Sequence, residues 1–192
     1  GKEREETEMK FALVNGEKAE AKPDLRGACA ECQSEMIAHC GTKKIWHWKH
    51  KRKSPYCWQE NETAWHRAWK DCFPIEWQEK IHIDDTNGEK HIADIKTAGG
   101  AVIEFQHSPI DPVERQKRER FYKDMAWVVD GVPRKRDYRR FCKGFSDLRP
   151  LEKGFFLAEF PDECFPEDWL GSSVPVYFDF QGNDPVDQQD EK

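Results

Sequence analysis

Long apolar segments are missing from this sequence. It contains no run of about eighteen apolar residues, the length that a transmembrane helix needs. Residues 1–10 are charged and lack the apolar stretch of a secretory signal. A disulfide scaffold is also disfavoured, because the 7 cysteines are odd in number and scattered over 192 residues. We therefore expect a cytoplasmic protein with reduced thiols, some of which could bind a metal.

A strong excess of positive charge is missing too. The formal net charge of -6 argues against a generic polyanion binder. Basic residues nevertheless gather in segments 43–53, 114–120 and 134–140, whereas residues 183–192 are acidic and polar. One such segment alone is typical of a solvated surface, but three that are interleaved with Trp and Tyr favour phosphate contacts and base stacking. The candidate nucleic-acid contacts are Lys49, Lys51, Arg52, Lys53 and Arg118.

Periodicity and turn residues predict one mixed α+β or α/β core with additions, because a chain of this length buries one moderate core. Asn15-Gly16 predicts a hairpin over 10–21 in a small β-rich module, and a helix with a Trp stripe runs from Trp58 to Pro74. Strands are predicted at 75–83, 91–98, 101–108, 127–131 and 174–180, and a helix at 111–126 with Asp111 and Pro112 at its start. The expected domains are 10–55, 56–143 and a C-terminal extension, 144–192.

The hairpin formed by the second and third core strands carries acids in an otherwise apolar setting. Strand alternation allows Asp94, Glu104 and Gln106 to share one face. A two-residue turn would pair Asp94 with Phe105, whereas a three-residue loop at 98–100 with a left-handed glycine sets Asp94 opposite Glu104. Opposed carboxylates at ~4.5–5.5 Å repel each other unless a cation lies between them. This pattern favours a Mg²⁺ or Mn²⁺ site.

A second group of polar residues supports that interpretation. Glu62, His66 and Lys70 recur every four residues along the edge of the Trp stripe. Alone, such a trio is most often an exposed ion-pair ladder, and one hairpin acid could simply pair with Lys96 or with a basic helix. Beside two acidic strands, the trio is typical of an active-site wall.

The order helix, three-strand meander, helix, strand resembles the PD-(D/E)XK nuclease core, and more closely its competence-protein CoiA-like branch, in which Gln replaces the usual motif lysine. The N-terminal "CAEC" and "HWKH" also resemble the Cys-x-x-Cys and His-x-x-His module of that family. The resemblance covers roughly residues 10–131. The core motifs that carry it are "ETAWHRAWK", "IADI", "VIEFQHSPI" and "ERQKRERFY" followed by "AWVVDG".

The resemblance implies a restriction-endonuclease-like core that holds a divalent metal. Its ligands would be Asp94, Glu104 and the main-chain carbonyl of Phe105, with Glu62 as an outer ligand. Such a metal lowers the pKa of a bound water and neutralises charge on the scissile phosphate.

Gln106 departs from the wider fold, which has a lysine at this position. An amide orients water or phosphate by hydrogen bonds, but it carries no charge. Lys70 or His66 could supply the missing cation or the proton transfer. A competing alignment uses Asp84 or Asp85, Asp94 and Lys96 as its acids and lysine.

Cys29-x-x-Cys32 and His47-x-x-His50 provide four ligands of the type that tetrahedral zinc requires. The interval between the histidines is shorter than in the common two-Cys, two-His finger, so another residue could replace one of them. A structural zinc in a zinc-ribbon-like module would hold segment 43–53 rigid against DNA. Alternatively, the cysteines are core thiols and the histidines belong to a DNA-facing loop. The possible replacement ligands are His39, Cys40 and Cys57.

Taken together, the sequence predicts a metal-dependent nuclease that hydrolyses DNA phosphodiester bonds in DNA uptake, recombination or phage and defence processing. The C-terminal extension is expected to cover the core or to mediate contact with a second copy or a recombination partner. The alternatives are a nuclease-fold module that binds DNA or a protein without cutting, and a zinc-dependent interaction adaptor.

Overall fold

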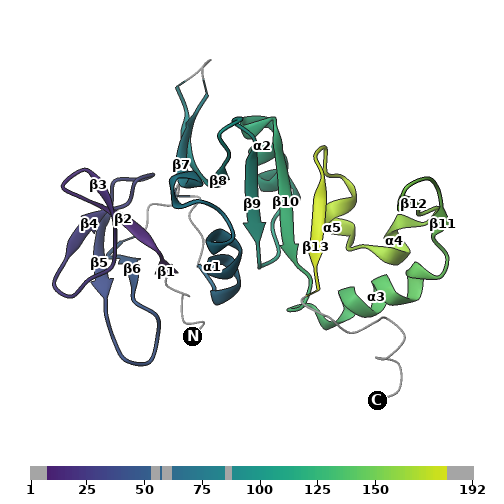
Figure 1. The fold of residues 1–192 in the computed structure, drawn as a ribbon, viewed down its shortest axis with the longest axis horizontal. Helices are drawn as coiled ribbons and strands as arrows, with labels where there is room; N and C mark the ends of the chain where they lie inside the picture. Colours follow the sequence, from purple (N-terminus) through teal and green to yellow (C-terminus); the bar gives the residue numbers. More distant parts are fainter. Residues whose placement is uncertain (1–7, 53–56, 58–61, 85–87, 181–192) are drawn as a thin grey trace. The chain divides into compact units, whose positions relative to one another are not determined.

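The computed structural model shows a mixed α+β chain (Figure 1) and describes residues 8–52, 57, 62–84 and 88–180. It forms two compact units, Gly1–Gly100 and Ala101–Lys192. No helix in these described residues is long and apolar enough to cross a membrane. Lys53, Trp58, Asp85 and segment 183–192, which carry expectations from the sequence, lie outside the described residues.

In the first unit, short antiparallel strands form a 6-stranded sheet in the order β1-β6-β5-β4-β2-β3 (Figure 1). Their bounds are β1 Glu8–Met9, β2 Phe11–Val14, β3 Glu17–Glu20, β4 Arg26–Ala28, β5 Glu35–His39 and β6 His47–His50. The predicted hairpin is confirmed, because β2 and β3 pair across Asn15-Gly16, whose φ angles of 53° and 83° suit a two-residue turn.

Trp48, on β6, belongs to the core of this small sheet and is fully buried. Its indole nitrogen donates to the carbonyl of Ala19 at 2.9 Å, so its one polar atom is satisfied. Gly27 allows the tight packing, since a Cβ there would lie 2.9 Å from the Leu13 carbonyl oxygen. Few other buried apolar residues support this core. A module with so small a core gains from a metal or another cross-link.

Helix α1 (Ala64–Asp71) follows, then the short 3-10 helix η1 (Ile75–Trp77) and the antiparallel strands β7 (Gln78–Ile83) and β8 (Lys90–Lys96). The helix is shorter than predicted, and its first residue follows Glu62 and the cap Thr63.

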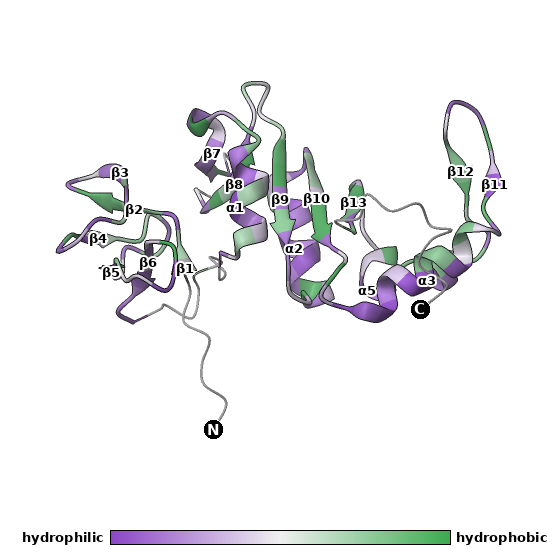
Figure 2. Cartoon of the chain, turned by 60° about the horizontal axis from the view of Figure 1, so that its bottom comes forward, coloured by the Kyte–Doolittle hydropathy of each residue, from purple (hydrophilic) through white to green (hydrophobic). Residues whose placement is uncertain are grey.

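The second unit contains a parallel arrangement of β9 (Val102–Gln106), β10 (Met125–Asp130) and β13 (Val176–Asp179), with β10 in the middle. Helix α2 (Pro112–Tyr122) connects β9 to β10, and Figure 2 shows mostly apolar strands beside this mostly hydrophilic helix. β13 shows that the C-terminal extension contributes a strand to this sheet.

The start of α2 agrees with the sequence. Asp111 is the N-cap, and its Oδ1 accepts from the backbone nitrogens of Val113 and Glu114 at 2.8 and 3.2 Å. The helix ends earlier than predicted because Lys123 adopts a left-handed φ of 62°. The remaining elements are α3 Lys135–Phe145, β11 Arg149–Pro150, β12 Phe156–Leu157, α4 Pro161–Cys164 and α5 Glu167–Leu170.

Candidate functional site

Helix α1 presents its polar seam to the interior. Glu62, His66 and Lys70 are buried, whereas Trp65 and Trp69 are partly exposed. The two tryptophans of the predicted Trp stripe that the structure describes are thus half-buried, beside a polar seam that is buried more deeply. The helix is rotated this way because its buried polar groups find charged and hydrogen-bonding partners within the first unit.

His66 fixes the start of the helix. The Thr63 hydroxyl accepts from the backbone nitrogen of His66 at 3.3 Å, and the Thr63 backbone nitrogen donates to His66 Nδ1 at 3.4 Å. This reciprocal pair is a capping box with histidine in the position usually taken by Glu or Gln. The Nδ1 atom of His66 therefore has a structural role.

Lys70 lies at the centre of a group of three carboxylates, which we call the Lys70 cluster. Its ammonium lies 3.1 Å from Glu62, 3.3 Å from Glu79 and 3.0 Å from Asp94. Lys70 itself is only 4% exposed. Glu62 and Asp94 thus share one cation, although they are 32 positions apart in the sequence. The sequence analysis expected Glu62 and Lys70 to lie beside the strand that carries Asp94.

Glu79 is the member of the cluster that the sequence did not reveal. Strand register places Gln78 opposite Ile95 and Lys80 opposite Ala93, so Glu79 lies opposite Asp94. Like charges in this position destabilise a sheet unless a cation lies between them, and Lys70 supplies that cation. Glu79 also has a φ of 45°, a conformation that a residue with a side chain seldom adopts inside a strand.

The loop that joins β7 to β8 explains why the sequence did not reveal Glu79. A two-residue Asn87-Gly88 turn would have paired Glu79 with Lys96, an ordinary ion pair. The backbone nitrogen of Asp84 instead donates to the carbonyl of Glu89 at 2.8 Å. That closure shifts the register by two residues and brings the two acids face to face.

The charges of the Lys70 cluster do not balance. Burial lowers the pKa of Lys70, but Asp94, Glu79 and Glu62 outweigh it and hold that pKa well above the usual value. Burial raises the pKa of Glu79, and the attraction of Lys70 offsets this only in part. Arg67 pairs with Glu62 at 3.2 Å. The side chain of Asp94 is 22% exposed, against 4% for Glu62, so Asp94 is the acid of the cluster that solvent reaches most.

The predicted site residues of β9 lie in the second unit. Glu104 and Gln106 are 5% and 1% exposed, and Phe105 on the opposite face is 3% exposed. Both faces of this strand are therefore covered, as is common in parallel sheets. The amide nitrogen of Gln106 donates to the Ser108 carbonyl at 2.8 Å, which gives it a role in shaping the end of the strand.

Arg118, predicted to contact nucleic acid, is 5% exposed. Its guanidinium lies 2.6 Å from Glu114 and 3.5 Å from Glu104. Arg118 sits on the inward side of α2, so it balances the charge of Glu104 and does not belong to a surface. Among the other predicted contacts, Lys51 and Arg52 are exposed and Lys49 is half-buried, while Lys51 pairs with Glu35 at 2.8 Å.

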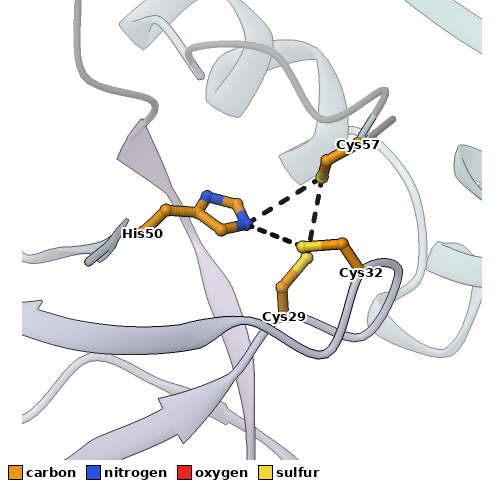
Figure 3. A group of neighbouring side chains, drawn as sticks. All are labelled: Cys29, Cys32, His50 and Cys57. Carbon is orange, nitrogen blue, oxygen red and sulfur yellow. Dashed lines mark hydrogen bonds between the residues drawn. The ribbon is translucent and has the colours of Figure 1, made fainter. Parts of the chain in front are cut away.

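The cysteine and histidine module forms a second site, shown in Figure 3. Cys29, Cys32, His50 and Cys57 each direct one ligand atom to a common centre, and these atoms lie within 4.8 Å of one another. The Cys29 and Cys57 sulfurs are 3.9 Å apart, and His50 Nε2 lies 3.4 Å from the Cys32 sulfur and 3.9 Å from that of Cys57. Zinc with ligands at about 2.0–2.3 Å separates tetrahedral ligand atoms by roughly 3.5–3.8 Å. The group has the composition and spacing of a zinc site.

His47, expected as the fourth ligand, lies outside this group, and Cys57 is there instead. The reason is strand geometry: residues three apart in β6 point to opposite faces of the sheet, so His47 and His50 cannot converge. His47 donates from Nδ1 to the Ile45 carbonyl at 2.7 Å and stacks on His39. Hydrogen bonding to Cys57, opposed by burial and helped by His50, lowers the pKa of the Cys29 thiol to about 4.

Comparisons with protein-family models, with curated proteins and with solved structures gave no match to this chain.

Proposed function

We propose that this chain is a divalent-metal-dependent nuclease that cleaves DNA. The observation that supports the proposal most is the Lys70 cluster, in which Glu62, Lys70 and Asp94 meet although the sequence separates them. Three carboxylates around one ammonium leave negative charge that a second cation can neutralise. A purely structural ion pair does not need this excess.

The carboxylates fit a hard cation. Mg²⁺ and Mn²⁺ take oxygen ligands, and the side chain of Asp94 keeps access to solvent while Lys70 holds its Oδ1 in place. In the proposed site, Asp94 binds the ion together with Glu104 and the Phe105 carbonyl, and Glu62 is the outer ligand. When bound, the ion supplies an activated water and charge neutralisation at the phosphate.

The turn after β8 supports the proposed arrangement. The backbone nitrogen of Gly100 donates to the Thr97 carbonyl at 3.0 Å, and Gly100 has a φ of 92°. A turn followed by a left-handed glycine is the usual form of a three-residue hairpin loop. Such a loop is what the pairing of Asp94 with Glu104 requires, and that pairing stays a prediction.

The test uses isosteric variants, so that shape is retained. Asp94→Asn and Glu104→Gln should each reduce Mg²⁺- or Mn²⁺-dependent cleavage of plasmid and single-stranded DNA by more than about a hundredfold, because each removes a charged ligand. Glu76→Gln, an exposed acid in the first unit, is the control and should cleave normally. Mn²⁺ binding measured by electron paramagnetic resonance gives a readout independent of turnover. Full cleavage by both variants would falsify the assignment.

Gln106 favours a second candidate function, a nuclease-fold module that binds DNA without cutting it. This residue stands where the wider fold has lysine, and its amide is engaged by the Ser108 carbonyl. In that case the wild-type chain binds DNA, no divalent metal supports cleavage, and Asp94→Asn leaves DNA affinity unchanged. A Gln106→Lys variant that gains cleavage would place the defect at this residue.

We also propose that Cys29, Cys32, His50 and Cys57 hold a structural zinc, which stiffens the basic segment around β6 for contact with DNA. The donor set of three thiols and one imidazole is a common structural zinc site. A cluster formed by residues of a small sheet with little core is where a metal contributes most to folding.

The two histidines of β6 provide a matched test of the zinc site. Cys57→Ser and His50→Ala should lose zinc and melt the module, whereas His47→Ala should keep one zinc per chain. Metal content by mass spectrometry and far-ultraviolet circular dichroism report the two effects. Loss of zinc from His47→Ala, with retention in Cys57→Ser, would reverse the assignment of the fourth ligand.

A further inference from the structure

The second unit has a cavity of about 550 Å³ at the start of α3. This volume is within the usual range for sites that bind small molecules, roughly 300–1,000 Å³. None of the residues that line it belongs to the site proposed for cleavage. They are Pro133, Arg134, Lys135, Arg136, Asp137, Arg140, Pro166, Glu167 and Asp168.

The first two turns of α3 contribute most of the positive charge of this cavity. Lys135 and Arg136 form the exposed first turn of α3, and Arg140 follows one turn later. The N-cap residue Arg134 makes no side-chain capping hydrogen bond. The amide of Asp137 donates to the Arg134 carbonyl at 2.8 Å, and the amides of Lys135 and Arg136 keep their capacity to donate to an anion. Arg134 pairs with Asp168 at 2.7 Å.

Asp137 adds a second and independent feature. It is only 7% exposed, yet within the described part of the chain its carboxylate has no hydrogen-bond or ion-pair partner. Burial raises the pKa of Asp137 despite the nearby Arg134 and Arg140, which agrees with a carboxyl group that lacks a direct partner. Its carboxylate oxygens are not fully buried, so they remain accessible from the cavity and can accept a hydrogen bond from a ligand there.

We propose that this cavity binds a phosphorylated ligand of nucleotide size. The phosphate lies at the first turn of α3, between Arg136 and Arg140, and Asp137 accepts a hydrogen bond from a hydroxyl or amine of the same ligand. Four basic and three acidic residues line the cavity. That balance suits a single phosphate group and disfavours a continuous nucleic-acid backbone. The ligand is either a free nucleotide or the phosphorylated end of a strand, which present the same chemistry.

The experiment is an isothermal titration of the full zinc-loaded chain with adenosine 5′-monophosphate, inorganic phosphate and adenosine. The monophosphate should bind best, phosphate more weakly, and adenosine not measurably. Arg136→Ala should weaken binding of the monophosphate about tenfold or more, as expected for a charge-assisted hydrogen bond. Arg139→Ala, on the same helix but outside the cavity lining, is the matched control and should bind as the wild type does.

Asp137→Asn separates the two parts of the site. It should retain phosphate binding, since it removes a negative charge, but reduce the advantage of the monophosphate over phosphate. Short oligonucleotides with a 5′-phosphate or a 5′-hydroxyl distinguish the two sources, and a preference for the 5′-phosphate identifies a strand end. Equal affinities in Arg136→Ala and Arg139→Ala, or no binding of either phosphate ligand, overturn the proposal. Asp94→Asn should bind normally, so this test is independent of the nuclease assignment.

Discussion

Each unit of the molecule contains a buried charged group with several partners, and the two groups compared, Lys70 and Glu119, have opposite sign. In the first unit, the Lys70 ammonium is surrounded by three carboxylates. In the second, the Glu119 carboxylate is surrounded by donors, most of which carry no charge. Both groups are less than 5% exposed. Burial alone therefore does not distinguish them, but the balance of charge does.

Glu119 is fully satisfied. Its Oε1 accepts from Ser172 at 2.9 Å and Trp127 at 3.3 Å and pairs with the Arg115 guanidinium. Its Oε2 accepts from the backbone nitrogen of Ser173 at 3.1 Å and from its hydroxyl at 2.8 Å. These bonds tie α2 to β10 and to the segment before β13. One carboxylate facing one guanidinium and several dipoles is a complete arrangement.

The charges around Lys70 differ from this arrangement: among the described residues one ammonium faces three acids, and of these acids Arg67 pairs with Glu62. Titratable groups whose pKa values are shifted by burial and by charged partners cluster at functional sites. We therefore predict that Glu119 contributes to stability alone. The Lys70 cluster lowers stability, and its acids are retained for a functional site.

Glu119→Gln should give the largest loss of stability. The amide cannot accept all of the bonds of Glu119, and it leaves the Arg115 guanidinium buried without a counter-charge. We expect the free energy of unfolding to fall by about 3–5 kcal/mol. Urea denaturation measures it, with hydrogen exchange of α2 as a local readout. Glu114→Gln, half-exposed on the same helix, should change little. A loss below that of the control would show that the network is dispensable.

Lys70→Met should destabilise the first unit by roughly 2–4 kcal/mol at neutral pH, because it leaves buried acids unpaired. Its distinctive property is rescue: Mg²⁺, Mn²⁺ or mild acid should restore much of the lost stability, since each neutralises the acids. Thermal denaturation with and without the metal tests this. Lys80→Met, exposed on β7, is the control. Absence of rescue by any cation would make the Lys70 cluster as structural as the Glu119 network.

The stability contributions of Glu119 and Glu79 should depend on pH in opposite directions. Burial tends to raise the pKa of Glu119, but its hydrogen bonds to Ser173 and Ser172 and to Arg115 hold it below the usual 4.5. Its contribution to stability is present above pH 4.5 and is lost as the pH falls through the lowered folded pKa. The raised pKa of Glu79 has the opposite effect, because its contribution is present below pH 4.5 and is lost as the pH rises through the folded value.

The difference in unfolding free energy between the wild type and each Gln variant, measured by urea titration from pH 3 to 7, checks both signs. The advantage of the wild type over Glu119→Gln should shrink in acid. Any disadvantage relative to Glu79→Gln should appear only toward neutral pH. Parallel profiles for the two variants would contradict the contrast.

Local patterns in the sequence predicted much of the fold. The Asn15-Gly16 hairpin and the cap at Asp111 depend on neighbouring residues only, and both are confirmed. Ligand choice at the zinc site failed in one position because it depended on whether His47 and His50 lie on a strand, which puts them on opposite faces.

The Lys70 cluster was predicted only in part, because some of its geometry depends on how strands pair and not on neighbouring residues. Glu62, Lys70 and Asp94 follow from residue type and spacing, although Glu62 precedes the helix whose repeat was used to find it. Glu79 depends on the register of β7 against β8, and the sequence alone does not fix that register. The burial of Arg118 depends on which side of α2 faces the sheet, and its charged sequence segment gave no periodicity from which to choose.

Glu79→Gln should have the smallest effect on stability and the most informative sign. Removing one of three acids from around Lys70 relieves repulsion across the strand pair, and the amide still fits opposite Asp94. We expect a change between zero and about 1 kcal/mol in favour of the variant at pH 7, whereas Glu119→Gln loses several. If Glu79 also helps to hold the cation, Mn²⁺ affinity falls although stability does not. A more stable protein with a weaker metal site is what we expect when an acid is retained for function. A loss of stability comparable to that of Glu119→Gln would remove the distinction between the two buried groups.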